Sequence, residues 1–244
     1  MTLDGLLKAY GDLPVLDGVS FTVGRGEFVA VVGPSGCGKS TLFDVVAGLE
    51  PPDGGRVLVD GVDVTGRTDA FAYMPQQDLL FPWRTVLDNT TLGLEVAGVR
   101  RRAARERARP LFAEFGLDGF EGARPGELSG GMRQRAALLR TVVQERPVLL
   151  LDEPFGALDA LTRADMQVWL STVRARFNWT VVLVTHDIRE AVFLADRVVV
   201  LGPRPTSVRR EVTVDLPRPR DLSTITDPSF AAAEAALLAG LQAA

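Results

Sequence analysis

The sequence predicts an α/β fold: a mostly parallel sheet with an antiparallel β portion before Asp78 and a helical insert near the middle. Short apolar segments rich in β-branched residues alternate with helix-like stretches, which is the pattern of a parallel sheet covered by helices on both faces. Three of these segments, VAVVG, VLLLDE and VVLVTH, are nearly continuous apolar runs that end in polar residues. Such runs are typical of central parallel strands buried on both faces.

The elements follow in order along the chain. We expect strands at 19–23, 28–32, 57–59, 70–74, 148–151, 181–185 and 198–201, and helices at 39–48, 86–97, 101–115, 131–145, 160–177 and 188–195. Turns are expected at Gly54-Gly55 and Asp60-Gly61, where glycine permits a positive φ. Residues 203–219 are expected to form a loosely ordered exit with a strand or two.

The 244 residues suffice for one large domain with a sizeable core. Within it we expect a catalytic core with the β subdomain over 1–78 and 128–215, a helical subdomain over 79–127, and a tail over 216–244. The Ala/Leu-rich segment 230–244 is expected to form a terminal helix packed on the domain, with an exposed interaction face as the alternative.

Composition excludes several classes of protein. A hydrophobic fraction of 46% and a charged fraction of 24% are those of a soluble globular chain. The net charge of −4 argues against a nucleic-acid-binding surface, which needs clustered excess cation. No run approaches the roughly 20 apolar residues needed to span a bilayer. The single cysteine, Cys37, permits no intrachain disulfide, and the first residues do not form a secretory signal, so we expect a cytoplasmic location.

One local stretch is basic despite this balance. Six arginines crowd the helix expected at 101–115 and its start: Arg100, Arg101, Arg102, Arg105, Arg107 and Arg109. Runs of charge usually form a solvated helix face, which we expect here. Contact with a partner protein or with lipid headgroups is the alternative.

A glycine-rich loop follows the strand expected at 28–32. It matches the pattern G-x-x-x-x-G-K-[ST] between a strand and a helix, and consists of Gly33, Pro34, Ser35, Gly36, Cys37, Gly38, Lys39, Ser40 and Thr41. Glycines let the backbone N–H groups wrap a phosphate, and the helix start adds a positive dipole end. Lys39 is expected at the β- and γ-phosphates, Ser40 on Mg²⁺, and Thr41 beside the α-phosphate. The chain contains only two lysines against 25 arginines, which makes a lysine at this place informative.

Two carboxylates end the strand at 148–151, where an uncompensated charge is costly. Asp152 is expected to hold Mg²⁺ through water, and Glu153 to orient and deprotonate the water that attacks the γ-phosphate. The only histidine, His186, follows the strand at 181–185 and therefore lies at the same sheet edge. We expect His186 to contact the γ-phosphate and orient the water rather than act as the base.

A second helix start also favours anions. In LSGGMRQR, Ser129 is expected to cap a helix that begins with Gly130 and Gly131, leaving free N–H groups and a positive dipole end. Because the glycine-rich loop is already expected to bind one side of a nucleotide, this helix N-terminus must bind another phosphate or another face of the nucleotide.

These motifs together resemble the nucleotide-binding subunit of ABC transporters, across essentially the whole chain. The resemblance implies a P-loop NTPase (RecA-like) core and a head-to-tail dimer, in which Ser129, Gly130, Gly131 and Gln134 complete the ATP site of the opposite protomer. It also implies that Tyr10 stacks on adenine and that Gln76 contacts Mg²⁺ and the attacking water, with Gln77 as the weaker choice. Asp159 resembles the residue that signals across the dimer, and a helix N-cap is compatible with that role.

The resemblance further implies that ATP closes the dimer, that hydrolysis at Glu153 releases it, and that the helical insert moves a separate permease. The partners are then a second copy, an integral membrane permease and, indirectly, a solute-binding protein, with the chain at the cytoplasmic face of the membrane. LLFPW at 79–83 and LPRPRD at 216–221 resemble the nitrate, sulfonate and taurine importer branch. Import of a thiamine-precursor pyrimidine also stays open. The rivals are a soluble ABC ATPase of nucleic-acid repair or translation, and a non-hydrolysing nucleotide sensor.

Overall fold

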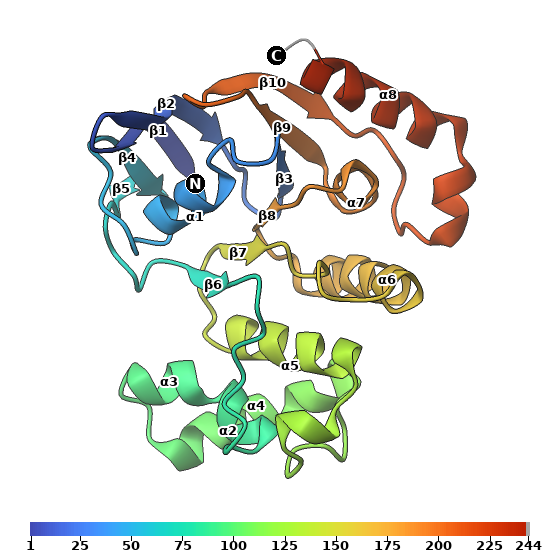
Figure 1. Cartoon of the computed structure of the whole chain (residues 1–244). Helices are drawn as coiled ribbons and strands as arrows, with labels where there is room; N and C mark the ends of the chain where they lie inside the picture. Colours follow the sequence, from blue (N-terminus) through green and yellow to red (C-terminus); the bar gives the residue numbers. More distant parts are fainter. Residues whose placement is uncertain (243–244) are drawn as a thin grey trace.

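A mostly parallel sheet lies at the centre of the computed structural model, which describes residues 1–242 (Figure 1). Within this range it has six strands in the order β10-β9-β3-β8-β7-β6. They are β3 (Phe28–Val32), β6 (Ala72–Met74), β7 (Leu149–Asp152), β8 (Val181–Val184), β9 (Arg197–Leu201) and β10 (Val208–Thr213). All neighbours pair in parallel except β10, which pairs antiparallel with β9 at the edge. The predicted parallel sheet is therefore confirmed.

Strand β3 separates two hydrophobic cores. Its five residues are fully buried, with Phe28, Ala30 and Val32 in one core and Val29 and Val31 in the other. Because successive side chains of a strand point to opposite faces, a strand with a core on each side must be apolar throughout. This accounts for the uninterrupted run VAVV in the sequence.

A second, antiparallel sheet packs over one of these cores. Its order is β2-β1-β4-β5, with β1 (Thr2–Tyr10), β2 (Leu13–Thr22), β4 (Gly54–Val59) and β5 (Val62–Asp63). The expected antiparallel β portion is confirmed, and so is the turn at Asp60-Gly61, where φ is 51° and 81°. However, the strand expected at 19–23 is only the end of β2, and β1 was not predicted.

The turn expected at Gly54-Gly55 is wrong, because both residues lie within β4. Gly55 has a φ of 83°, and a Cβ built on it would lie 2.3 Å from the carbonyl oxygen of Gly5 on β1. Glycine is needed there for a close approach of two strand backbones, not for a reversal of the chain.

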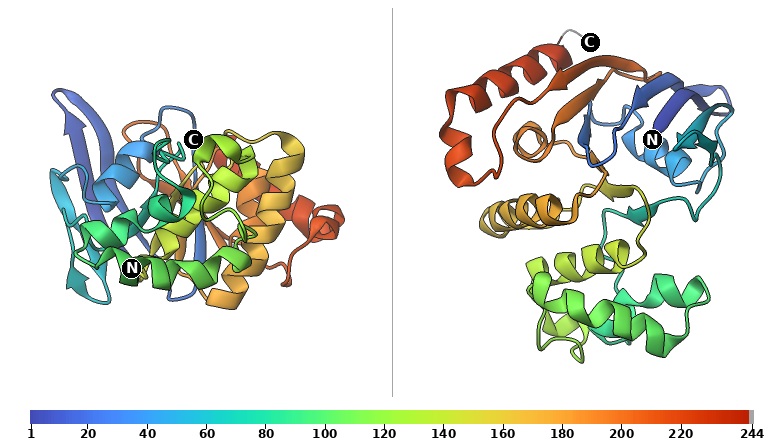
Figure 2. Two further views of the ribbon diagram at one scale, coloured as in Figure 1. Left: turned by 90° about the horizontal axis from the view of Figure 1, so that it is seen from below. Right: turned by 180° about the vertical axis from the view of Figure 1, so that it is seen from behind.

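Helices form a layer below the β6–β7 edge of the sheet, as Figure 1 and the right view of Figure 2 show. This layer consists of α2 (Val86–Thr90), α3 (Leu92–Val96), α4 (Arg101–Glu114), the 3₁₀ turn η1 (Pro125–Glu127) and α5 (Gly130–Val142). The single helix expected at 86–97 is in fact two, with the break at Thr91. The Thr90 hydroxyl donates to the carbonyl of Leu87, and such bonds from a side chain to the backbone compete with regular helix structure.

The remaining helices cover the sheet itself: α1 (Lys39–Val46), α6 (Ala160–Phe177), α7 (Ile188–Leu194), η2 (Leu222–Thr226) and α8 (Pro228–Gln242). Helix α8 lies against β10 at the outer edge (Figure 2). Phe230 and Leu237 of α8 are buried, so the packed tail helix is confirmed, except at residues 243–244, which lie outside the described residues.

The exit from the sheet is better ordered than the sequence predicts. It contains strand β10 and then a fully buried arginine, Arg220, whose guanidinium donates to five backbone carbonyls. Three of these carbonyls belong to the end of α7 and two to the segment after β10. Among the described residues, no helix combines the length and apolar character needed to cross a bilayer.

Candidate functional site

The carboxyl ends of four parallel strands meet at one edge of the central sheet. The glycine-rich loop follows β3, Gln76 lies two residues beyond β6, Glu153 follows β7 and His186 lies two residues beyond β8. Strands β6, β7 and β8 pair in parallel register, and β8 pairs in turn with β3. Ligands of open α/β sheets bind at such an edge.

Glu153 lies at the centre of this edge. Its Oε2 accepts a hydrogen bond from Gln76 Nε2 at 3.1 Å and lies 3.2 Å from His186 Nδ1. The backbone of Glu153 has a φ of 42°, in the left-handed region, and its N–H donates to the carbonyl of Val184 on β8. The structure thus brings together three of the residues singled out in the sequence, and a backbone conformation rare for glutamate aims the carboxylate.

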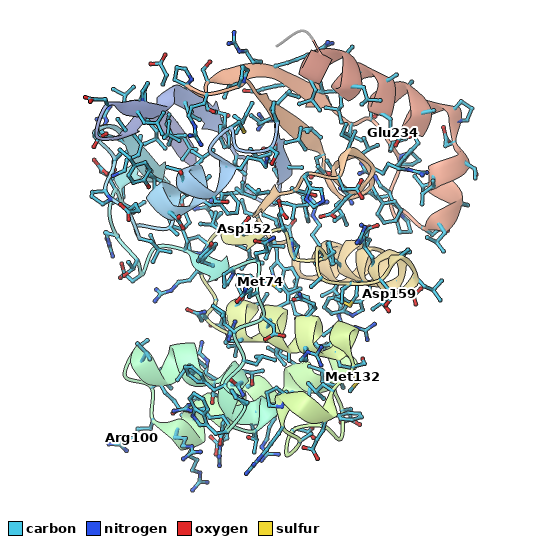
Figure 3. The ribbon with its side chains drawn as sticks, viewed as in Figure 1. Met74, Arg100, Met132, Asp152, Asp159 and Glu234 are labelled. Carbon is cyan, nitrogen blue, oxygen red and sulfur yellow. The ribbon has the colours of Figure 1, made fainter. Side chains whose placement is uncertain are left out.

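Asp152 is the more deeply buried of the two carboxylates, with 8% of its surface exposed. Its pKa is raised to about 6, first by burial and then by the charge of Glu153. The Tyr73 hydroxyl donates to Asp152 Oδ2 at 3.4 Å, and burial followed by repulsion from Asp152 raises the pKa of Tyr73. Tyr73 is not among the residues predicted from the sequence, although its place on the strand that leads into YMPQQ was a usable signal. Figure 3 labels Asp152 close to Met74, on the neighbouring strand.

The glycine-rich loop has the backbone that phosphate binding requires. Gly36 and Gly38 have φ of 74° and 117°, and α1 begins at Lys39. The Lys39 ammonium donates to the carbonyls of Gly33 and Pro34, each at 3.0 Å. Ser35 and Ser40 are exposed, Thr41 is half-buried, and Cys37 is buried inside the loop.

The oxygen donors at this edge fit a hard divalent cation. Asp152 offers a carboxylate whose ionised form is disfavoured by burial, so a nearby cation would restore it, and Ser40 offers an exposed hydroxyl. Within the described part of the chain, no group of three or more His, Cys, Asp or Glu side chains could hold a metal on its own. A cation such as Mg²⁺ would therefore need further oxygen ligands besides these two residues, from Gln76, from water or from a bound phosphate.

The second predicted anion-binding site, the N-terminus of α5, lies elsewhere in the molecule. Ser129 caps α5, and its Oγ accepts from the Met132 N–H at 3.3 Å. Figure 3 shows Met132 in the helical layer, well separated from Asp152. A Cβ on Gly131 would lie 2.9 Å from Thr162 Cγ2, so glycine is needed for α5 to pack on α6. The N-terminus of α5 therefore does not lie at the phosphate loop of its own chain.

Other predicted residues take separate positions. Gln134 is buried and lines a cavity of about 570 Å³ together with Gln76, Gln77 and Gly156. Asp159 caps α6, where its Oδ1 accepts from the N–H groups of Leu161 and Thr162, so the N-cap interpretation describes its contacts.

Tyr10 ends β1 with 48% of its surface exposed, which leaves the ring available for stacking, and the Lys8 ammonium lies 5.2 Å from the ring centroid.

Four arginines of helix α4 make ion pairs, two of them with the buried Asp88. Arg101 and Arg105 both contact Asp88 at 2.6 Å, Arg102 contacts Glu106 and Arg107 contacts Glu145. Only Arg100 and Arg109 of the six make no ion pair with a residue in the described part of the chain. Partial neutralisation of the cluster favours the solvated helix face.

Comparison with known proteins agrees with these features. Residues 16–156 match the sequence family described as ABC transporter. The chain is 47% identical over 232 residues to the aliphatic sulfonates import ATP-binding protein SsuB of Ralstonia nicotianae, covering 95% of this chain and 78% of that one. It is 46% identical over 208 residues to the taurine import ATP-binding protein TauB of Burkholderia thailandensis, covering 85% and 80%.

A solved structure extends the likeness to the fold. It is the dimeric post-hydrolysis state of an ATP-binding cassette bound to ADP and phosphate, with a TM-score of 0.73 and 30% sequence identity. The match covers 88% of this chain and 99% of the cassette. With the phosphate loop, the carboxylates after β7 and the family match in agreement, the chain is an ATP-binding and ATP-hydrolysing member of the ABC transporter family.

Proposed function

We propose that the chain is the ATPase subunit of an importer for a small organic sulfonate, and that two copies close head to tail around two Mg-ATP at the cytoplasmic face of the membrane. The observation that carries the catalytic part is the carboxylate of Glu153, which contacts both Gln76 and His186 through one oxygen. With Oε2 engaged by its neighbours, Oε1 is the oxygen left to accept a proton from water.

Each residue at the sheet edge then has a role. Glu153 deprotonates the attacking water. Gln76 contacts Mg²⁺ and that water, His186 contacts the γ-phosphate and orients the water, and both side chains also hold the Glu153 carboxylate in place. Ser40 and Asp152 hold Mg²⁺, which neutralises charge on the phosphate oxygens when bound. Lys39 and the backbone of residues 33–41 bind the phosphates, and Tyr10 stacks on adenine.

The proposal of a closed dimer rests on the separation between the phosphate loop and the N-terminus of α5 within one chain. The N-terminus of α5 presents free N–H groups and Gly130-Gly131, yet it lies in the helical layer, away from the phosphate loop of its own chain (Figure 3). A second copy, related by a two-fold axis, could place its α5 on the phosphates. ATP would then favour the closed dimer because Ser129 reaches it only there. A dimeric relative supports this arrangement.

The membrane partner has a candidate docking surface. A hollow of about 640 Å³ lies between β6 and the helical layer, lined by Tyr73, Leu79, Phe81, Leu92, Val96 and Arg140 among others. Val96 is 82% exposed, and Trp83, 69% exposed, stacks on Phe81 with the ring centroids 5.0 Å apart. Exposed apolar rings beside a hollow are typical of a protein interface, and we assign this one to the permease, with the solute-binding protein acting through it.

The solute class rests on the names of the relatives. Aliphatic sulfonates and taurine, the solutes in the names of SsuB and TauB, share a sulfonate group. Nitrate and a thiamine-precursor pyrimidine are the alternatives for a transport assay. Neither the sequence relatives nor the net charge of −4 supports a role in nucleic-acid repair or translation.

Glu153→Gln tests the catalytic assignment. The amide keeps the shape of the side chain but cannot accept a proton, so ATP hydrolysis should fall by about 10² to 10⁴-fold while ATP still binds. The variant should accumulate as an ATP-bound dimer in light scattering. Glu106→Gln, an exposed change on α4, is the matched control and should leave hydrolysis unchanged. A Glu153→Gln protein that hydrolyses ATP at the normal rate, or stays monomeric in saturating ATP, contradicts the proposal.

A further inference from the structure

The loop between β9 and β10, residues 202–207, contacts the phosphate loop through two side-chain hydrogen bonds. Arg204 Nη2 donates to the carbonyl of Gly36 at 2.7 Å, and the Thr206 hydroxyl donates to the carbonyl of Cys37. Two consecutive carbonyls of the phosphate loop are thus held by side chains that come from a segment about 170 residues further along the chain. None of the sequence motifs includes either residue.

The Thr206 contact has a direct consequence for phosphate binding. In a trans peptide the C=O and the N–H point in opposite directions. The carbonyl of Cys37 shares its peptide plane with the N–H of Gly38, so holding that carbonyl outward directs the Gly38 N–H to the opposite, inner side of the loop. An N–H aimed in this direction is one of the groups with which such a loop cradles phosphate. The neighbouring Cys37 N–H is already used in a turn within the loop, where it donates to Pro34.

Thr206 itself is fixed from the other side. It is fully buried, its N–H donates to the carbonyl of Val15 at 2.8 Å, and its carbonyl accepts from the N–H of Asp17 at 2.8 Å. These bonds make a parallel bridge between residue 206 and β2, and Figure 1 shows the start of β10 beside β2. The hydroxyl therefore projects from a backbone that has little freedom to move.

Strand β2 also contacts the phosphate loop directly. A Cβ built on Gly38 would lie 2.8 Å from Val15 Cγ1, so the loop lies against the strand. Because β2 pairs with β1, which ends at Tyr10, the same segment connects the phosphate loop to the sheet that carries the aromatic side chain. A buried carbonyl that lost its donor here would be left unsatisfied, at a cost that the loop could relieve by rotating the peptide.

We propose that Thr206 and Arg204 are positioning residues for ATP binding: they orient peptide groups of the phosphate loop and act without contacting the nucleotide. The inference rests on the ATP-binding function proposed above. It extends the nucleotide site to the β9–β10 loop and makes the affinity for ATP, rather than the hydrolytic step, the quantity that these residues control.

Three variants test the proposal, with Kd for ATP and ADP measured by titration and KM and kcat by phosphate release. Thr206→Val keeps the shape of the side chain and removes the donor, so Kd and KM should rise about tenfold with kcat changed less than twofold. Thr206→Ser restores the hydroxyl and should recover most of the affinity. Arg204→Gln should raise Kd about threefold, since a single exposed hydrogen bond is lost.

Arg210→Gln removes the same charge from a nearby exposed site on β10 and is the matched control, with no change expected. Loss of thermal stability with a normal Kd in Thr206→Val, or a Thr206→Ser protein as weak as the valine variant, overturns the proposal. If the valine variant does not fold, Arg204→Gln decides, because its side chain is exposed, and a Kd equal to that of Arg210→Gln overturns the role of the loop. The wild-type titration distinguishes failure of the positioning role from failure of the proposed function: a wild type that does not bind ATP contradicts the proposed function itself.

Discussion

Replacing Glu190 with glutamine should make the protein more stable than the wild type, and this difference in stability should grow as the pH rises. Glu190 lies on α7 with 4% of its surface exposed, and its Oε1 has no hydrogen-bond partner among the described residues. Burial, and then the charges of Asp187 and Glu153, raise its pKa to about 8, while Arg163 and a hydrogen bond with Thr185 act in the opposite direction. Glutamine resembles the protonated acid in shape and has no proton to lose.

The sign follows from the pKa of the two states. The unfolded chain ionises near the ordinary value of 4.5, and the native state keeps its proton up to about pH 8. Between these values stability falls as the pH rises, by at most about 1.4 kcal/mol per pH unit, and above pH 8 the loss is complete. Full burial would make the total about 5 kcal/mol, and water penetration lowers it, so we expect Glu190→Gln to gain about 2 to 4 kcal/mol over the wild type by pH 8.5.

Urea denaturation followed by tryptophan fluorescence, at several values between about pH 5.5 and 8.5, measures this difference. Other titrating groups cancel when the variant is subtracted from the wild type. Glu106→Gln, at an exposed site, should give a difference near zero throughout. A Glu190→Gln difference that stays constant across the pH range refutes the assignment of a raised pKa.

Two further variants have expected outcomes. Arg220→Met should lower the free energy of unfolding by about 2 to 5 kcal/mol, because five carbonyls lose a buried donor; urea denaturation measures the loss, and Arg210→Met, with an unchanged midpoint, is the control. Asp152→Asn should raise the Mg²⁺ concentration needed for half-maximal hydrolysis at least tenfold. In the absence of nucleotide and at about pH 7.5, the same variant should be about 1 to 3 kcal/mol more stable than the wild type, because the pKa of Asp152 is raised to about 6 from an ordinary 3.8. Equal stability of the two proteins at that pH would count against a buried carboxylate.

The central sheet could be predicted from the sequence because burial on both faces imposes an unmistakable apolar run on its strands. Strand β1 could not, since its alternation is broken by register shifts and by Lys8, which occupies a buried position. That lysine is tolerated there because its ammonium donates to the carbonyl of Pro51 and lies 3.5 Å from Glu50. Local periodicity contains no sign of partners more than 40 residues away.

The same division holds at the nucleotide site. Glu153 and His186 could be placed together because each follows a parallel strand and such strands end at one edge, whereas Gln76 was expected there from the family resemblance. Thr206 and Arg204 could not, because they act on the phosphate loop through a turn that reaches it only in three dimensions. A threonine and an arginine in a polar exit segment have no distinguishing pattern in the sequence.

Lys39 has one more consequence. Its ammonium already touches two carbonyls of its own loop, and only 8% of the residue is exposed. A free lysine loses about 2 kcal/mol of rotamer freedom when it is held in one geometry, and here that ordering precedes the arrival of a triphosphate. When a nucleotide binds, the Lys39 ammonium then exchanges neutral carbonyl oxygens for anionic phosphate oxygens as hydrogen-bond acceptors. It does not have to be ordered from a mobile state.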